Sequence, residues 1–419
     1  MRLSNNLMYQ NSINNILKNQ QGVASAQERV TTGEKYLTTS EAPAAVSQGM
    51  LYTNKIETNE QYTKNINQLK GRLETEHSIL KGMNENILAT QELTIRAGNG
   101  SLSKSDLAGI AGELQELQKS LVNLMNTQSE GGKYIFSGYQ DNIQTYTFNN
   151  LTKKYEYQGD QGQHEVTIAK GVEIKSSDNG FNAFEKVNAR LDVTSNRGIA
   201  TGTITSGTVY VSNQGEFDKF HSNNYNTDPD PLVSATVNTY NVNVLPGATA
   251  SSPDTYEILR DGVPLVPPVT GEVTDEAIEF AGMEIKLEGE APGQLDFSLE
   301  KPHKENVLNT LQGLITSLKD ETLEGEDLQQ ALASGLIQLK NASEQVVFTQ
   351  SSLGGRMNVV DKVTDSNSAV DINNKASKSS LVEVDMAEAI SELTKQETGL
   401  QASQATFGRL AKLTLFDYI

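Results

Sequence analysis

Apolar residues recur with a helical period at both ends of the chain and with a different period in the middle. From Leu107 to Leu124 they are spaced alternately three and four residues apart. In the C-terminal part they fall every seven residues, in one run that starts at Leu332 and another that starts at Met386. A repeat of 3.5 residues places a narrow apolar stripe along a helix, and other helices are needed to bury it. We therefore predict long helices at both ends of the chain that return to the same place and pack together.

Capping and breaking residues mark the boundaries of these helices. A first, Asn-rich segment covers about residues 6–32, and Gly33 follows it as a C-terminal stop. A long helix starts near Pro43, and Ser103 opens the next helix with a capping box. Because Asn is a poor helix former, we expect the first segment to be disordered in the free chain and helical only when it packs against partners.

Between the helical ends, the pattern changes to the period of two that is typical of strands. Residues 155–157 and 166–168 alternate around a Gly-Asp-Gln-Gly turn, which predicts a hairpin between them. Residues 189–300 are rich in Thr, Val, Gly and Asn, and Asp261 followed by Gly262 is a strong signal for a tight hairpin turn. A compact β domain is therefore predicted between the two helical halves.

These patterns predict a mainly α fold with an inserted β domain, in which the N- and C-terminal segments form a long antiparallel helical bundle or coiled coil. Three domains are expected. They are a terminal helical assembly domain that is disordered in the monomer (residues 1–38 plus 381–419), a helical rod domain (residues 42–188 plus 303–376) with a β-hairpin region (residues 134–185), and an inserted β-rich outer domain (residues 189–302).

The helical spacing separates two sets of apolar residues. The first set is expected to contact other subunits and contains Ile13, Ile16, Val23, Val30, Met386, Ile390, Leu393, Leu400, Phe407 and Leu410. The second set is expected to close the bundle inside the chain and contains Leu69, Leu73, Leu80, Leu114, Leu121, Leu339, Val346 and Leu353. Heptads alone also fit an intramolecular bundle or a generic coiled-coil dimer.

The composition excludes several classes of function. The chain has 419 residues, no Cys and a formal net charge of −19 at pH 7. The absence of Cys excludes thiol nucleophiles, disulfides and cysteine-ligated metals. The acidic balance argues against nucleic acid or membrane binding, since both need clustered Lys and Arg. Residues 1–19 are polar and lack the apolar core of a signal peptide, so export would need another route.

No catalytic, cofactor-binding or metal-binding residue is predicted. His77 lies within the expected helical stripe, where a packing histidine is favoured over a metal ligand. Glu324, Glu326 and Asp327 resemble a paired-carboxylate site, but they stand where a helix starts, and the helix dipole favours acids there. The other histidines are scattered without ligand spacing: His164, His221 and His303. Nothing in the sequence combines a nucleophile, a base and an oxyanion hole.

Six short motifs lie near the two ends of the helical parts of the chain. In chain order, the motifs are residues 28–33 (ERVTTG), 39–45 (TSEAPAA), 134–139 (YIFSGY), 157–160 (YQGD), 388–393 (EAISEL) and 400–403 (LQAS). They resemble motifs of the bacterial flagellins and of their relatives, the flagellar hook-associated protein 3 family of hook–filament junction proteins. The resemblance covers about residues 1–185 and 275–419. The order of these motifs along the chain and their placement at both termini make the match specific.

The resemblance implies a flagellin-like fold and a structural, non-catalytic role in the bacterial flagellum, where the protein would join the hook to the filament. The implied partners are hook-associated protein 1, flagellin, a transiently bound filament cap protein, an export chaperone at the C-terminal helices, and further copies of the chain in a ring. Neither nucleic acid nor a membrane is among them. The expected location is extracellular, after export without a cleaved signal peptide.

Other functions stay open at this point. A filament flagellin is the nearest alternative, although residues 415–419 differ from the leucine-arginine ending typical of flagellin. A secreted adhesin or enzyme on a helical stalk would need a functional pocket within residues 190–300. An intracellular coiled-coil signalling protein would not need the inserted β domain.

Overall fold

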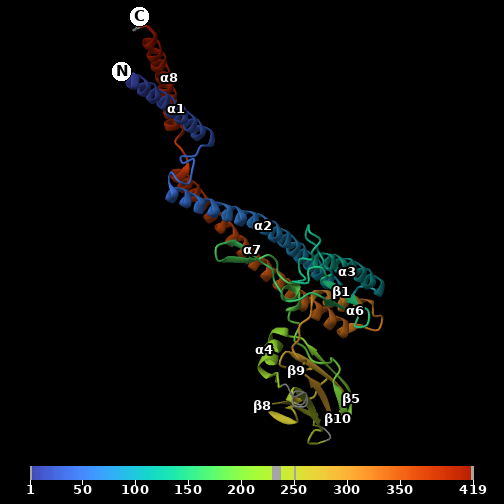
Figure 1. Cartoon of the computed structure of the whole chain (residues 1–419). Coiled ribbons are helices and arrows are strands. Elements are labelled where there is room, and N and C mark those ends of the chain that lie inside the picture. Colours follow the sequence, from blue (N-terminus) through green and yellow to red (C-terminus); the bar gives the residue numbers. More distant parts are fainter. Residues whose placement is uncertain (1, 229–236, 250–251, 417–419) are drawn as a thin grey trace. The chain divides into compact units, whose positions relative to one another are not determined.

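The computed structural model describes residues 2–228, 237–249 and 252–416, and its side chains are described from residue 7 to residue 409 outside these gaps. The chain forms two compact units (Figure 1). Unit 1 contains Met1–Lys70, Val166–Ile174 and Met357–Ile419, and unit 2 contains Gly71–Glu165 and Lys175–Arg356. The predicted mainly α fold with an inserted β domain is confirmed. The three domains predicted from the sequence have other boundaries than these two units and stay a prediction.

Two long helices, α2 (Pro43–Ala97) and α7 (Gly325–Val382), contribute to both units. Within unit 1 the Asn59 side-chain amide donates to the backbone carbonyl of Asn367 at 2.8 Å. Within unit 2 the hydroxyl of Ser343 lies 2.7 Å from Asn84 Oδ1 and donates to it. Since the residue numbers fall along one helix as they rise along the other, α2 and α7 are antiparallel in both units, as predicted.

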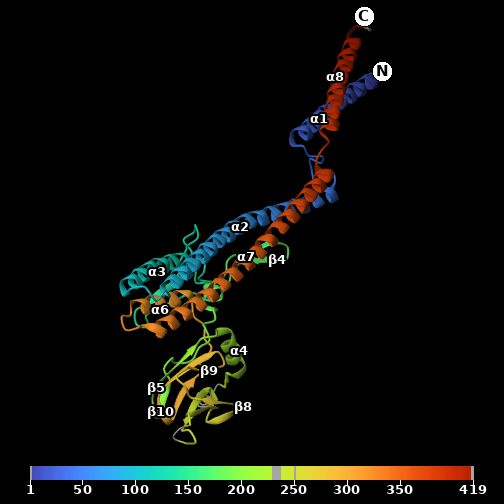
Figure 2. The same ribbon diagram turned by 180° about the vertical axis from the view of Figure 1, so that it is seen from behind.

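The helical part of unit 2 also contains α3 (Lys104–Met125) and α6 (Val307–Lys319), which lie beside α2 and α7 in both views (Figures 1 and 2). The predicted capping box at the start of α3 is confirmed, because Ser103 and Asp106 each bond the backbone N–H of the other. The Gln118 side chain joins α3 to α6 by donating to the carbonyl of Leu308 at 2.9 Å.

Two short hairpins correct the hairpin predicted around the Gly-Asp-Gln-Gly turn. Strand β2 (Lys154–Tyr157) pairs with β1 (Tyr146–Asn149), and β3 (Glu165–Ala169) pairs with β4 (Val172–Lys175). The turn instead packs against the segment before β1, where Asp160 Oδ1 accepts a hydrogen bond from the backbone N–H of Tyr139 at 2.9 Å. A short π-helix, η1, follows at Phe181–Glu185.

The inserted β domain is an antiparallel sheet with the strand order β5-β10-β6-β7-β8, and β9 also pairs with β10. Its elements are β5 (Ile199–Val211), α4 (Gln214–Asn224), β6 (Thr239–Leu245), β7 (Thr255–Arg260), β8 (Val263–Glu272), β9 (Ile278–Phe280) and β10 (Met283–Ser298). The predicted turn joins β7 to β8, with φ of +52° at Asp261 and +72° at Gly262. The core includes Phe217 from α4, which the sequence pattern did not predict to be helical.

Two further helices, α1 (Arg2–Thr32) and α8 (Met386–Phe416), belong to unit 1. Helix α1 ends where predicted, because Gly33 adopts a φ of +73° and its N–H bonds the carbonyl of Arg29. Helix α8 starts after Asp385, whose carboxylate accepts from the N–H of Ala387 at 2.8 Å. None of the described helices is long and apolar enough to cross a membrane.

Candidate assembly interface

Helices α1 and α8 pack against each other within the chain. The ring of Tyr9 meets the ring of Phe407 edge to face, with centroids 5.8 Å apart. Further along α1, the Asn19 side-chain amide donates to Ser403 Oγ at 2.6 Å. Beyond the helix ends, the N–H of Val384 donates to the carbonyl of Gly33 at 2.9 Å, which closes a short antiparallel bridge. The two helices therefore form an antiparallel pair, which we call the terminal pair.

The contact between the two helices follows a heptad spacing on each of them. On α1 the less exposed positions that follow this spacing are Tyr9, Ser12, Ile16, Asn19, Val23, Ala26 and Val30. On α8 those that follow it are Ala389, Leu393, Gln396, Leu400, Ser403 and Phe407. Four polar side chains interrupt this seam, and polar residues at such positions fix the register of a coiled coil at a cost in stability. The terminal pair is therefore specific in its register but weakly apolar.

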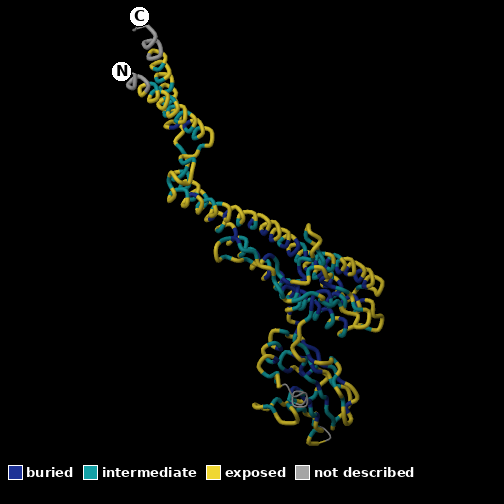
Figure 3. Tube along the Cα trace, viewed as in Figure 1, coloured by how far each residue is buried: buried dark blue, intermediate teal, exposed yellow. Residues whose placement is uncertain are grey.

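Most residues of the terminal pair are exposed or half-buried (Figure 3), and its apolar side chains are buried only in part. Within its seam, Ala26 and Ala389 are buried, each 6% exposed, and the larger apolar side chains are half-buried. Outside the seam are large apolar side chains that are mostly exposed, which we call the terminal apolar residues. They are Leu7, Met8, Ile13, Leu17, Met386 and Ile390, between 45% and 60% exposed. Exposed apolar residues gathered on one element commonly mark a contact with another protein.

The residues predicted to contact other subunits divide into three groups. Six of them lie half-buried in the seam of the terminal pair: Ile16, Val23, Val30, Leu393, Leu400 and Phe407. Ile13, Met386 and Ile390 are exposed, and the side chain of Leu410 lies outside the described residues. The first group therefore already has contacts inside the chain, and only the second is open to a partner. Whether either group contacts another subunit stays a prediction.

The eight residues predicted to close the bundle inside the chain are all buried. They are Leu69, Leu73, Leu80, Leu114, Leu121, Leu339, Val346 and Leu353, each at most 2% exposed. Between Leu73 and Leu80, however, the apolar stripe passes through Glu76, which is buried, and not through His77, which is half-buried. His77 therefore lies beside the stripe and not in it, with its Nδ1 buried. The spacing of three and four residues places Glu76 in the stripe, but the residue is polar and a search for apolar residues passes over it.

The acids at the start of α7 bind residues of other elements in unit 2. The Tyr210 hydroxyl donates to Asp327 Oδ1 at 2.7 Å, and the ammonium of Lys286 lies 2.5 Å from Glu326 Oε1. Burial, followed by the hydrogen bond to Asp327, raises the pKa of Tyr210 to about 12. These contacts tie the inserted sheet to α7, which agrees with the structural interpretation of the acids.

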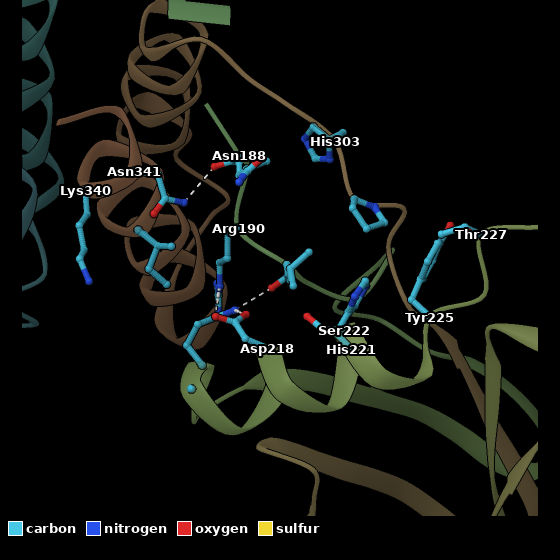
Figure 4. Close-up of a pocket in the computed structure, with 16 residues that line it drawn as sticks. Asn188, Arg190, Asp218, His221, Ser222, Tyr225, Thr227, His303, Lys340 and Asn341 are labelled. Atoms are coloured by element: carbon cyan, nitrogen blue, oxygen red, sulfur yellow. Dashed lines mark hydrogen bonds between the residues drawn. The ribbon is translucent and has the colours of Figure 1, made fainter. Parts of the chain in front are cut away.

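A cavity of about 760 Å³ lies between α4, α7 and the segment before β5 (Figure 4). It brings together His221 and His303, which are 82 residues apart in sequence. His221 is buried, its Nε2 lies 2.8 Å from the carbonyl of Glu300, and burial lowers its pKa. The buried guanidinium of Arg190 on the same wall donates to Gln214 and, on α7, to Gln330.

The polar groups of this cavity hold the β domain to α7. Asn341 of α7 donates to the carbonyl of Asn188 at 2.9 Å, as Figure 4 shows. Arg190 also forms an ion pair with Asp192, at 3.4 Å. Across the residues that the structure describes, no group of three or more His, Cys, Asp or Glu side chains is arranged to hold a metal ion. The cavity is therefore best explained as a junction within unit 2.

Two protein-family models match the ends of the chain. The bacterial flagellin N-terminal helical region matches residues 3–141, and the bacterial flagellin C-terminal helical region matches residues 336–419. The first match contains α1, α2 and α3, and the second contains α8 and most of α7. The terminal pair therefore combines one helix from each of the two matched regions.

Curated relatives and solved structures agree with these matches. The chain is 30% identical over 174 residues to flagellar hook-associated protein 3 of Escherichia coli (strain K12), which covers 42% of this chain and 54% of the relative. It is 32% identical over 140 residues to flagellar hook-associated protein 3 of Salmonella typhimurium, covering 33% and 44%. The chain thus spans about half the length of the curated relatives it matches.

A crystal structure of flagellar hook-associated protein 3 from Legionella pneumophila has a similar fold. It superposes with a TM-score of 0.58 at 23% identity, over 79% of this chain and 98% of that chain. The flagellin-like fold implied by the sequence motifs is confirmed by this likeness and by the two family models.

Proposed function

We propose that this chain, which belongs to the family of flagellins and flagellin-like flagellar proteins, is a structural component that joins the hook of the bacterial flagellum to the filament. The single observation that carries the proposal is the terminal pair. It brings together the two regions that this family is known by, and it leaves the terminal apolar residues exposed. An element that is specific in register but incompletely buried is suited to assembly with other subunits.

The proposed partners are those that the resemblance to the hook–filament junction proteins implies, and the terminal pair would provide the contact surface. On the hook side the chain would contact hook-associated protein 1. On the filament side it would contact flagellin and, transiently, the filament cap protein. Copies of the chain would also contact each other and close a ring. The export chaperone would bind the C-terminal helices, which carry three exposed or half-buried apolar positions at Met386, Ile390 and Leu393. If the terminal pair becomes ordered during assembly, these positions would be buried against neighbouring subunits. The folding of the terminal helices would then be coupled to the addition of the subunit to the flagellum.

A non-catalytic role fits the contacts at the one cavity described above. Its charged side chains bind other groups of the protein, with Arg190 bound to Gln214 and Asp192. We place the protein outside the cell, on the flagellum, after export without a cleaved signal peptide.

Filament flagellin is the second candidate, because the matching family models describe the helical regions of flagellin. The two candidates differ in self-association. A junction subunit needs only to close a ring with copies of itself, whereas a filament subunit must also stack along the axis, and head-to-tail contacts that do not close produce open filaments.

Removal of the gene from the source bacterium tests the proposed function. We expect the mutant cells to keep their hooks, to lack filaments and to release flagellin into the medium. The wild-type gene and Ser391→Asp should restore filaments, whereas Ile390→Asp should not. Ser391 is an exposed polar neighbour of Ile390, so the two variants introduce the same charge one residue apart. Filaments of normal length in the mutant would refute the junction role, and full rescue by Ile390→Asp would show that the terminal apolar residues are not needed.

A further inference from the structure

A carboxyl group lies in the apolar interior of the helical part of unit 2. Glu76 is fully buried on α2, in the stripe between Leu73 and Leu80. Side chains with a charge are rarely found in such positions unless a partner neutralises them. The groups around Glu76 therefore decide whether it carries a charge.

Two charged residues from other elements face Glu76. Asp178 follows β4, and its backbone N–H donates to Glu76 Oε1 at 2.9 Å. Arg356 of α7 forms a close ion pair with Asp178 Oδ2, and its second nitrogen donates to the carbonyl of Lys175 at 3.3 Å. Glu76 Oε2 is buried and has no hydrogen-bond partner among the described residues. The neighbouring His77 lies on the same helix, and its Nδ1 is also buried without a hydrogen bond.

The charges in this cluster balance only if one carboxyl is neutral. Arg356 supplies one positive charge, and this charge is already neutralised by the Asp178 carboxylate in their ion pair. A second carboxylate at Glu76 would be a buried charge beside a like charge, which is strongly unfavourable. Burial first, and the charge of Asp178 second, raise the pKa of Glu76 to about 8. The hydrogen bond from the N–H of Asp178 and the charge of Arg356 act in the opposite direction but are smaller.

We propose that Glu76, Asp178 and Arg356 form a proton-dependent clamp that holds the segment after β4 between α2 and α7 at neutral pH and releases it in alkaline medium. In the closed clamp, Glu76 carries a proton and is a neutral acid, and its Oε1 accepts the hydrogen bond from the backbone N–H of Asp178. When hydroxide removes this proton, water forms and Glu76 becomes a carboxylate. Two carboxylates then share one guanidinium in a dry site, and the segment that carries Asp178 is repelled from α2.

The direction of the pH effect follows from linkage. The unfolded chain holds Glu76 with an ordinary pKa of 4.5, whereas the folded chain holds it with a pKa of about 8. Between these values the folded state binds the extra proton, so the stability of unit 2 falls as the pH rises and is lowest above about pH 8. Glu76→Gln keeps a neutral side chain of the same shape and removes this dependence.

Infrared spectroscopy and pH-dependent unfolding of the full chain test the clamp. The wild type should show the carbonyl band of a buried protonated carboxylic acid at pH 7, and this band should disappear with a midpoint near the pKa of about 8. Glu76→Gln should lack the band, and the exposed neighbour Glu74→Gln should retain it. Between pH 5 and pH 8, the unfolding equilibrium constant of the wild type should rise relative to that of Glu76→Gln by up to about tenfold per pH unit.

A second variant keeps the test decisive if Glu76→Gln fails to fold. Asp178→Asn removes the competing carboxylate and leaves Arg356 free to neutralise Glu76, so the midpoint of the infrared titration should move to lower pH. A wild type without a titrating buried carboxyl band, a band that survives in folded Glu76→Gln, or a midpoint unchanged in Asp178→Asn would each overturn the clamp.

Discussion

The terminal pair and the helical part of unit 2 are built from the same heptad spacing, yet they differ in how completely the spacing is buried. In unit 2, Leu114, Leu339 and Leu353 are 0% exposed, because other helices and, near Leu353, the segment after β4 pack against these stripes. In the terminal pair, Leu400 and Phe407 are half-buried, because one helix covers only one side of another. The heptad spacing therefore predicts that a helix packs against another helix. It does not predict whether enough elements of the same chain surround the stripe to bury it completely.

The largest difference between the two regions should appear when a charge is placed in each stripe. Leu114→Asp should unfold unit 2, since an unpaired charge in a closed core costs several kcal/mol. Leu400→Asp should leave the main melting transition nearly unchanged, because the side chain is already partly open to water. Circular dichroism melting of both variants checks this. Equal losses of melting temperature would mean that the terminal pair is as well packed as unit 2.

Limited proteolysis should separate the two regions by their local stability. The terminal pair has few fully buried side chains, so it should open more often than unit 2. A nonspecific protease should remove roughly 35 residues from each end of the monomer and leave a resistant core. Mass spectrometry of the fragments locates the cuts, and ends that resist cleavage as well as the centre does would contradict the comparison.

The smallest effect is expected when a polar residue in the seam of the terminal pair is replaced by an apolar one, because the stripes of unit 2 are mostly apolar. Asn19→Leu replaces a polar seam residue on α1 by an apolar one, while Ser403 keeps its hydrogen bond to the carbonyl of Gly399. We expect it to slow proteolysis of the termini by an amount equivalent to about 1 kcal/mol or less. Gln20→Leu, at an exposed position next to it, is the control. If both changes slowed proteolysis equally, the residues of the seam would contribute no more to the stability of the terminal pair than exposed residues do.

Local sequence signals predicted the helices well, because each signal acts within a few residues. The capping box at Ser103 and the stop at Gly33 satisfy backbone groups of their own helix ends, so no distant residue is needed to read them. The alternation at Tyr155 and Tyr157 also predicted a strand correctly. It did not reveal the partner of that strand, since β1 at Tyr146 shows no clear alternation and pairing is a tertiary contact.

The sequence did not reveal two kinds of residue: polar residues in buried positions and the apolar residues of α4. Glu76 lies in an apolar stripe, and only Asp178 and Arg356, 102 and 280 residues away in sequence, explain why it is tolerated there. Phe217 and Phe220 of α4 have helical spacing, but they stand in a short segment between strands, where the strand pattern dominated. The stripes predicted the residues that are buried in unit 2, whereas Ile13, Met386 and Ile390, which were predicted to contact other subunits, are exposed in the structure.

The most direct test of the account is the addition of the purified chain to isolated flagellar hooks, followed by electron microscopy. We expect the chain to stay monomeric or to form small oligomers at micromolar concentration, even with flagellin seeds present. It should bind hook tips only after hook-associated protein 1 has been added, and Ile390→Asp, but not Ser391→Asp, should lose this binding. Long filaments made of this chain alone would contradict the junction role and favour the flagellin alternative.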